Sequence, residues 1–101
     1  MIARTWRGWA SAATADDYQR HYETEVAEHL RELPGFRGAR LLRRADGEEV
    51  EFTSITFFAD LDAVRGFAGD SYEEAVVEEK AQRALSHWDD HVSHAEVAVA
   101  L

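Results

Sequence analysis

The chain has 101 residues, 46% of them hydrophobic, a length that fits one domain spanning residues 1–101. Twenty acidic against eleven basic side chains give a net charge of -9, so we expect neither nucleic acid nor an anionic membrane as a partner. The absence of cysteine excludes a disulfide framework and a thiol nucleophile, and favours the cytoplasm. Apolar stretches are far shorter than the ~20 residues that cross a bilayer, and no signal sequence is expected.

The first third of the chain predicts a strand followed by a long helix. Residues Ile2–Trp9 are β-branched and aromatic without helical spacing, which is typical of a strand. Thr14 and Asp17 resemble a capping box that opens a helix, and Pro34-Gly35 ends it. Between them, apolar residues recur at steps of three and four and form one stripe, namely Tyr18, Tyr22, Val26, Leu30 and Leu33. His21 and His29 lie close to this stripe, and we interpret them as residues of the helix flank.

The middle of the chain predicts a β-hairpin. Two extended runs, Phe36–Arg44 and Glu49–Phe58, are joined through Asp46-Gly47. This dipeptide favours a type I′ turn, because both central residues of that turn need positive φ. A two-residue loop made of this dipeptide would place Arg44 opposite Glu49.

The last part of the chain predicts two helices and a final strand. Asp60 is placed to cap a short helix over 61–68. Tyr72–Leu85 has helical spacing with a break expected near Glu79, and His94–Leu101 alternates between apolar and other residues as a strand does. This order of elements is the split βαβ of ferredoxin-like α+β domains, with a four-stranded antiparallel sheet.

The hairpin strand that ends at Phe58 has no strongly polar face. Thr53, Ile55 and Phe57 alternate with Phe52, Ser54, Thr56 and Phe58. Helices cover only one face of such a sheet, so something else must bury the other face, and the same face of a second subunit is the economical candidate. The sequence therefore predicts a homodimer.

Basic residues gather in the first part of the chain. Residues 1–44 hold 8 Arg and 6 acids, a charge of +2, whereas residues 45–101 hold 3 bases and 14 acids, a charge of -11. The arginines of the first hairpin strand are interpreted first as partners for these acids and second as an anion site. They are Arg37, Arg40, Arg43 and Arg44.

Four short motifs of the sequence can be compared with known families. They are Ile2–Gly8, Leu33–Ala39, Phe67–Gly69 and His94–Val97. Together they resemble the antibiotic biosynthesis monooxygenase superfamily over essentially the whole chain, and Pro-Gly-Phe-x-Gly-Ala, from Pro34 on, is the most specific piece. The resemblance implies a dimeric α/β barrel with a small cavity in each subunit. It also implies a small apolar or aromatic, polyketide-like ligand, because characterised members include cofactor-independent oxygenases that turn polyketide phenols into quinones, as well as haem-degrading monooxygenases.

Cofactor-independent oxygenation needs few catalytic groups, because the substrate itself reduces O2, so we predict no cofactor. A phenol, once deprotonated, can give an electron to O2, and the site must bind, desolvate and stabilise the anion. We predict two catalytic residues, His94 and Tyr72. The predicted ligand-binding residues are Trp6, Arg40, Phe67, Trp88 and His91. Each aromatic side chain could instead belong to the core, and each histidine could instead bond backbone or lie on the surface.

Three other functions stay open as alternatives. Haem-degrading relatives use an axial His on the helix after the third strand, with an Asn on the first strand and a nearby Trp. Residues 61–79 contain neither His nor Trp, and residues 2–9 contain no Asn, so that mechanism is not expected. A metal site would need His87, His91 and His94 to converge, and no recognised motif is matched. A non-catalytic ligand-binding or accessory protein is the alternative from another class.

Overall fold

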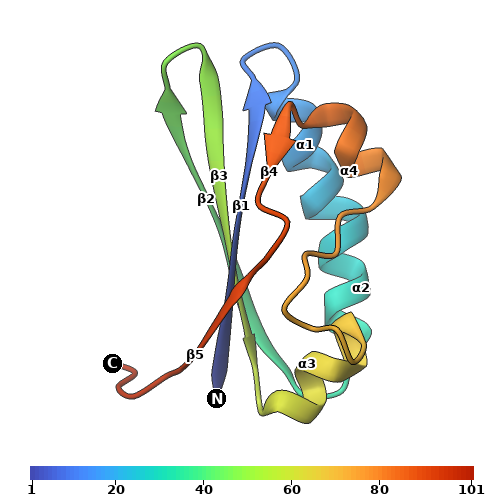
Figure 1. The fold of residues 1–101 in the computed structure, drawn as a ribbon, viewed down its shortest axis with the longest axis vertical. Coiled ribbons are helices and arrows are strands. Elements are labelled where there is room, and N and C mark those ends of the chain that lie inside the picture. Colours follow the sequence, from blue (N-terminus) through green and yellow to red (C-terminus); the bar gives the residue numbers. More distant parts are fainter.

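An antiparallel sheet with helices against one face makes up the structure, a computed structural model that describes residues 1–101 (Figure 1). The strands are β1 (Ile2–Ser11), β2 (Phe36–Asp46), β3 (Glu49–Phe58), β4 (His87–Trp88) and β5 (Ser93–Glu96). Their order is β2-β3-β1, and the short β4 and β5 share the remaining edge of β1. This is the predicted ferredoxin-like arrangement, with the fourth strand position divided in two. None of the helices combines the length and apolar character that a membrane crossing needs.

One long helix covers the sheet, in three segments: α1 (Ala15–His21), the π-helical η1 (Tyr22–Val26) and α2 (Ala27–Glu32). The predicted apolar stripe faces the core, with Tyr18 and Leu30 buried. The predicted capping box was wrong. The Thr14 hydroxyl donates to the carbonyl of Ala84 at 2.8 Å instead, so it ties the start of α1 to the end of α4 (Glu79–Ala84).

The hairpin forms as predicted, but its turn is displaced. Asp46 pairs with Glu49, so the central residues of the turn are Gly47 and Glu48. Gly47 has φ +62° while Glu48 does not have a positive φ, which fits a type II′ turn and not the predicted type I′. The register therefore places Arg44 opposite Glu51 and not Glu49.

The helix predicted over Tyr72–Leu85 is mostly absent. After α3 (Leu61–Ala68), which Asp60 caps as expected by accepting from the Ala63 amide at 2.9 Å, only α4 is helical. Residues 73–75 instead pair with residues 90–92 and exchange backbone hydrogen bonds with them, for example from the Ala75 amide to the Asp90 carbonyl at 2.8 Å. These tertiary hydrogen bonds replace the helical ones.

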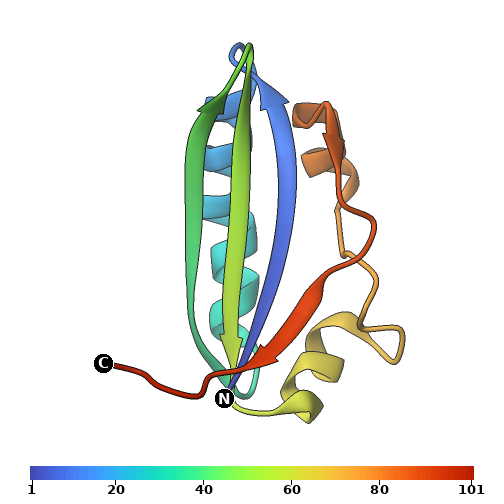
Figure 2. The same ribbon diagram turned by 60° about the vertical axis from the view of Figure 1, so that its left-hand side comes forward.

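The final strand is shorter than the predicted His94–Leu101. Its pairing ends where β1 begins, because Ile2 is opposite Glu96 and the Val97 amide makes the last bond, to the Met1 carbonyl at 2.8 Å. Beyond this point the chain extends away from the body of the molecule (Figures 1 and 2). Val99 is accordingly 75% exposed.

The core lies between the sheet and the helices and consists of two apolar clusters. One gathers around Phe52 and Tyr18 near the hairpin end, and the other around Phe58, Leu30 and Val64 near α3. Both phenylalanines are fully buried and come from β3, the strand between β1 and β2. A cavity lies where the two clusters meet.

Candidate functional site

A cavity of about 120 Å³ lies between the sheet and the helices. Its walls come from β1, β3, the 15–32 helix, α3 and residues 76–78, and ten of its sixteen lining residues are hydrophobic. A dry cavity of ~150 Å³ can hold benzene, so this one suits a molecule of about one ring. Most of its polar lining comes from Arg4, His21, Tyr22, His29, Ser54 and Thr56.

Arg4 places a positive charge in the cavity wall. It is 5% exposed, on the helix-facing side of β1. Its guanidinium donates to the carbonyls of Tyr72 and Glu74, the latter at 3.0 Å from Nη2, and lies over the ring of Phe67. Burial lowers the pKa of Arg4 to about 10, so the group stays charged at neutral pH. Its hydrogen-bond partners are two carbonyls and His94, none of them a carboxylate, so no negative side chain neutralises the charge.

His94 is a hydrogen-bond acceptor for Arg4. The two side chains meet at 3.0 Å, from Arg4 Nη1 to His94 Nε2. A guanidinium can only donate, so Nε2 must accept and the proton of the neutral imidazole is on Nδ1. Burial, followed by the charge of Arg4, lowers the pKa of His94 and favours this neutral form. Tyr72 packs edge-on against the ring, with centroids 5.4 Å apart.

Trp6 is fixed from two sides as a wall of the cavity. Its indole Nε1 donates to the Asp89 carbonyl at 2.8 Å, which connects β1 to the segment after β4. The ring lies across Gly8, where an added Cβ would come within 2.6 Å of the indole. Gly8 is therefore the residue that leaves room for this orientation of the indole.

His21 is buried on the helix side of the cavity, with 5% exposure. Its Nδ1 lies 2.6 Å from Glu25 Oε2, one helical turn along, and Glu25 also pairs with Lys80 Nζ at 3.0 Å. The hydrogen bonds from Lys80 and His21 lower the pKa of Glu25. The other ring nitrogen of His21, Nε2, is buried and has no hydrogen-bond partner.

The hydroxyl of Tyr22 is a second buried polar atom; the side chains of Ser54 and Thr56 lie near it, but no hydrogen bond of good geometry joins them. Burial raises the pKa of Tyr22, so the phenol stays protonated and can donate. Both His21 and Tyr22 lie where α1 passes into the π-helical η1. Single π-helical turns occur frequently at functional sites, because they change the direction of side chains locally.

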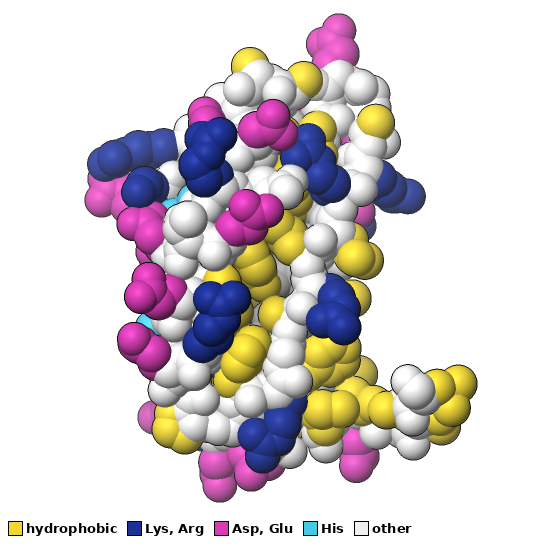
Figure 3. All heavy atoms as spheres, turned by 180° about the vertical axis from the view of Figure 1, so that it is seen from behind, with side chains coloured by type: hydrophobic (Ala, Val, Ile, Leu, Met, Phe, Trp, Pro, Cys, Tyr) yellow, Lys and Arg dark blue, Asp and Glu magenta, His cyan; other side chains and the backbone are white.

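A wider groove of about 690 Å³ opens between the long helix and β2. Figure 3 shows apolar side chains gathered along this hollow, with basic side chains on both sides of it. Tyr22 and Leu30 line both the groove and the inner cavity, so they separate the two.

Comparison with known proteins identifies the fold. No protein-family model matches the sequence, and no curated protein matches it. Solved structures match over nearly the whole chain. SnoaB from Streptomyces nogalater, a cofactor-independent oxygenase, is 22% identical in its N63A mutant, with a TM-score of 0.68 over 99% of this chain and 95% of that one. The monooxygenase ActVA-Orf6 of Streptomyces coelicolor, in complex with nanaomycin D, is 15% identical, with a TM-score of 0.67 over 99% and 89%.

The chain has the fold of the antibiotic biosynthesis monooxygenases. The haem-degrading MhuD of Mycobacterium tuberculosis, with two haems bound, shares this fold at 18% identity, with a TM-score of 0.63 over 100% of this chain and 99% of that one. At these identities the likeness establishes the antibiotic biosynthesis monooxygenase fold, and the reaction has to be argued from the site.

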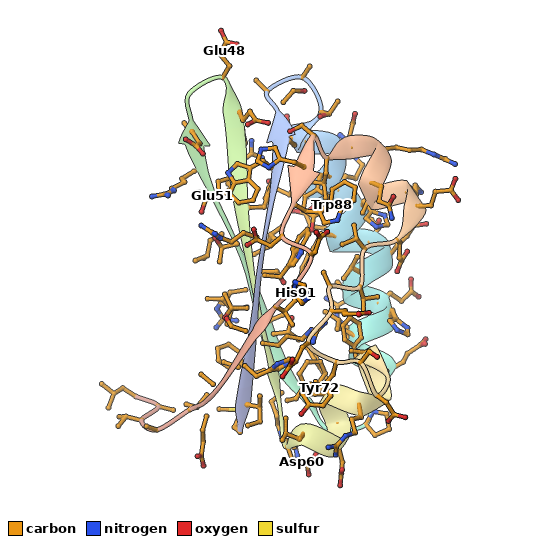
Figure 4. All side chains as sticks on the ribbon, viewed as in Figure 1. Glu48, Glu51, Asp60, Tyr72, Trp88 and His91 are labelled. Carbon is orange, nitrogen blue, oxygen red and sulfur yellow. The ribbon has the colours of Figure 1, made fainter.

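Within this fold, the predicted site residues divide into two groups. Trp6 and Phe67 line the cavity, and Tyr72 and His94 lie against Arg4 at its wall. The other three do not line it: Trp88 packs against the hairpin-end cluster, His91 forms a backbone bridge with Glu74, and Arg40 lies exposed on β2. Figure 4 shows Tyr72, Trp88 and His91 spread along the helix side of the molecule. The catalytic and binding roles of all seven stay predictions.

Sequence reasoning missed the helix side of the cavity. His21, interpreted as a flank residue, is buried, and Arg4 was not considered. Signals for both were present. His21 lies three residues after Tyr18 and four before Glu25, and Arg4 shares the inner face of β1 with Trp6, two residues away.

The arginines of β2 and the C-terminal histidines have separate surroundings. Arg44 pairs with Glu51, one of the acids of residues 45–101, as predicted, whereas Arg43 pairs with Asp16 of the first part of the chain. Arg37 and Arg40 donate only to neighbouring backbone carbonyls. His87 pairs with Glu49 at 3.1 Å, and together with the contacts of His91 and His94 this keeps the three histidines apart. No group of three or more metal-ligating side chains gathers anywhere in the chain.

Proposed function

We propose that this protein binds a small, largely apolar aromatic molecule with an acidic hydroxyl, a phenol or enol, and oxidises it with O2 without a cofactor. One observation carries the proposal. Three polar groups line an apolar cavity: the Arg4 guanidinium, whose charge no carboxylate neutralises, His21, whose Nε2 is buried without a hydrogen bond, and Tyr22, whose hydroxyl is buried near Ser54 and Thr56 without one. Buried polar atoms are nearly always hydrogen-bonded, and a ligand oxygen would satisfy these. SnoaB, of the same fold, is a cofactor-independent oxygenase.

The chemistry needs only the ligand and O2. A phenol that loses its proton can pass an electron to O2, and the resulting radicals combine at carbon. The overall conversion of phenol and O2 into quinone and water balances: one oxygen atom enters the ring, the other leaves as water, and the ligand loses four electrons. The protein excludes water, stabilises the anion beside Arg4 and accepts the proton.

The size of the cavity sets the range of ligands. About 120 Å³ suits one ring, whereas pockets for drug-sized ligands have ~300–1,000 Å³. A polycyclic phenol would have to displace Tyr22 and extend into the groove beside β2. One-ring phenols are therefore the first ligands to test.

A thermal-shift screen followed by oxygen-uptake measurements tests the proposal. The purified protein would be screened against one-ring phenols, polycyclic phenols, quinones, flavins and haem, because a ligand of the native state raises its stability. We expect phenols to raise the melting temperature and to be consumed together with O2. Stabilisation by haem or flavin alone, or by no compound, would contradict the proposal.

A non-catalytic ligand-binding or accessory protein is the second candidate. The small volume of the cavity and its aromatic wall of Trp6, Tyr18 and Phe67 favour this role, because they leave little space for O2 beside a ligand. It predicts that phenols raise the melting temperature while oxygen consumption stays at the rate of the uncatalysed reaction.

We further propose that the protein is a homodimer. The sheet face away from the helices carries half-buried Ile55 and Phe57, together with Leu42, which is 52% exposed. The alternating residues Val97–Leu101 extend beyond the sheet and offer a further apolar surface. Light scattering at micromolar concentration should give twice the monomer mass of 11.4 kDa, and a monomeric mass would contradict the proposal.

A further inference from the structure

Building on the proposed function, we propose that His21 is the base that removes the proton from the ligand hydroxyl, and that Glu25, held by Lys80, is a positioning residue for it. The substrates of this site would be neutral one-ring hydroxyarenes or enols. Neither residue was predicted from the sequence, and the inference rests on the contacts of His21.

The contact with Glu25 determines which nitrogen of His21 is basic. Glu25 Oε2 lies 2.6 Å from Nδ1, and an ionised carboxylate can only accept a hydrogen bond. Lys80 and His21 lower the pKa of Glu25, which keeps this carboxylate ionised at neutral pH. The proton of the neutral imidazole is therefore on Nδ1, and Nε2 carries the free electron pair. Nε2 is also the atom that is buried without a partner.

The other titratable groups of the cavity are less suited to act as the base. His94 Nε2 already accepts from Arg4, and His29, which lines the cavity, has no carboxylate partner. Burial raises the pKa values of Tyr18 and Tyr22, so both act as donors at neutral pH. Glu78 lines the cavity from an exposed position. A base oriented by a third group is the usual arrangement for proton abstraction.

The step balances as a simple proton transfer. The O–H bond of the ligand breaks, an N–H bond forms at His21 Nε2, and the electron pair stays on the ligand oxygen. The imidazolium is stabilised by Glu25, and the new anion by the charge of Arg4. Glu25 has a half-exposed side chain, 49%, so it provides a route by which the proton can later reach solvent.

The tests use the full chain and 4-nitrophenol, whose anion absorbs visible light while its neutral form does not. At a pH about one unit below the pKa of the free probe, we expect the wild-type protein to bind it mainly as the anion. His21→Gln should still bind the probe, as the neutral form. For a phenol that the wild type oxidises, the same change should lower kcat by ~100-fold with little change in KM. Glu25→Gln should lower kcat by ~10-fold, as expected when the imidazole is less well oriented.

His87→Gln is the matched control, because it removes a histidine from another His–carboxylate pair, with Glu49, outside the cavity. It should keep both the anion signal and the turnover. Bound anion and full kcat in His21→Gln would overturn the role of His21 while leaving the proposed function intact. Failure of the wild type to bind any phenol would overturn both the role of His21 and the proposed function. If His21→Gln loses its far-ultraviolet circular dichroism, His21→Asn replaces it in the same measurements.

Discussion

Two of the three histidines at the cavity, His94 and His21, differ in the hydrogen bonding of their Nε2 atoms. On the strand side, His94 Nε2 accepts from Arg4, which also bonds two carbonyls of residues 72–74, so each group there has partners. On the helix side, His21 Nε2 and the Tyr22 hydroxyl are buried without partners. A satisfied polar network stabilises a fold, whereas buried polar atoms without partners reduce stability. The strand side therefore stabilises the fold through its hydrogen bonds while the Arg4 charge lines the cavity, and the helix side is the half whose polar atoms lack partners.

The largest effect on stability is expected for Arg4→Met. The change removes hydrogen bonds to the Tyr72 and Glu74 carbonyls and to His94, and should lower the free energy of unfolding by ~2 kcal/mol in urea titrations. Arg7→Met is the control, because Arg7 lies on the same strand in an exposed pair with Asp89 and should cost ~0.5 kcal/mol. Equal free energies of unfolding for Arg4→Met and Arg7→Met would contradict the conclusion that the hydrogen bonds of Arg4 stabilise the fold.

His94→Leu should lower the free energy of unfolding by ~1 kcal/mol, because Arg4 loses one acceptor. His94→Gln should cost less, since its amide oxygen can accept from the same guanidinium. Chemical denaturation of the two variants would measure both changes in the free energy of unfolding. If His94 is instead the predicted catalytic residue, His94→Leu will abolish turnover while the melting temperature stays nearly unchanged.

The titration of His94 gives a pH-dependent prediction. Its folded-state pKa is lowered from 6.5, so below pH 6.5 the unfolded chain takes up a proton at this residue before the folded one does. The free energy of unfolding should therefore fall as the pH drops from 6.5 to the folded pKa, and this contribution should level off below it. His94→Gln should remove that part of the slope, which denaturation curves at several pH values would measure. If the free energy of unfolding of His94→Gln depends on pH as strongly as that of the wild type, groups other than His94 cause the dependence.

The smallest effect on stability is expected for Tyr22→Phe. The hydroxyl is buried without a hydrogen bond, so its removal should change the free energy of unfolding by less than ~0.5 kcal/mol, or raise it. The affinity for phenols should fall at the same time, as calorimetry would measure. Tyr18→Phe, another cavity tyrosine, provides a comparison. A large loss of stability in Tyr22→Phe would mean that the hydroxyl has a partner in solution.

Local patterns predicted the elements whose hydrogen bonds are local. The apolar stripe of the long helix, the cap at Asp60 and the hairpin around Gly47 depend on residues close in the chain, and all three are present. The segment 72–85 had a helical pattern as well. Its backbone instead bonds to residues 90–92 and to Arg4, and periodicity does not reveal these partners.

The candidate site was accessible to sequence reasoning only in part. Trp6 and Phe67, which we predicted to bind a ligand, line the cavity, because large aromatic residues on inward faces fill the space between sheet and helices. The His21–Glu25 pair follows an i,i+4 spacing, but the contacts between β1 and β5 and between η1 and α4 that complete the surroundings of the two histidines follow no spacing rule.

The sequence by itself determined the ferredoxin-like order of elements and the likeness to the antibiotic biosynthesis monooxygenases, because hydrophobic period and turn residues act over short distances. Only the tertiary structure decided that Arg4 satisfies His94 and that His21 is left with a free Nε2 beside Tyr22. The physical reason is that the hydrogen-bonding state of a buried group is fixed by neighbours from other elements, which come together only when the chain folds.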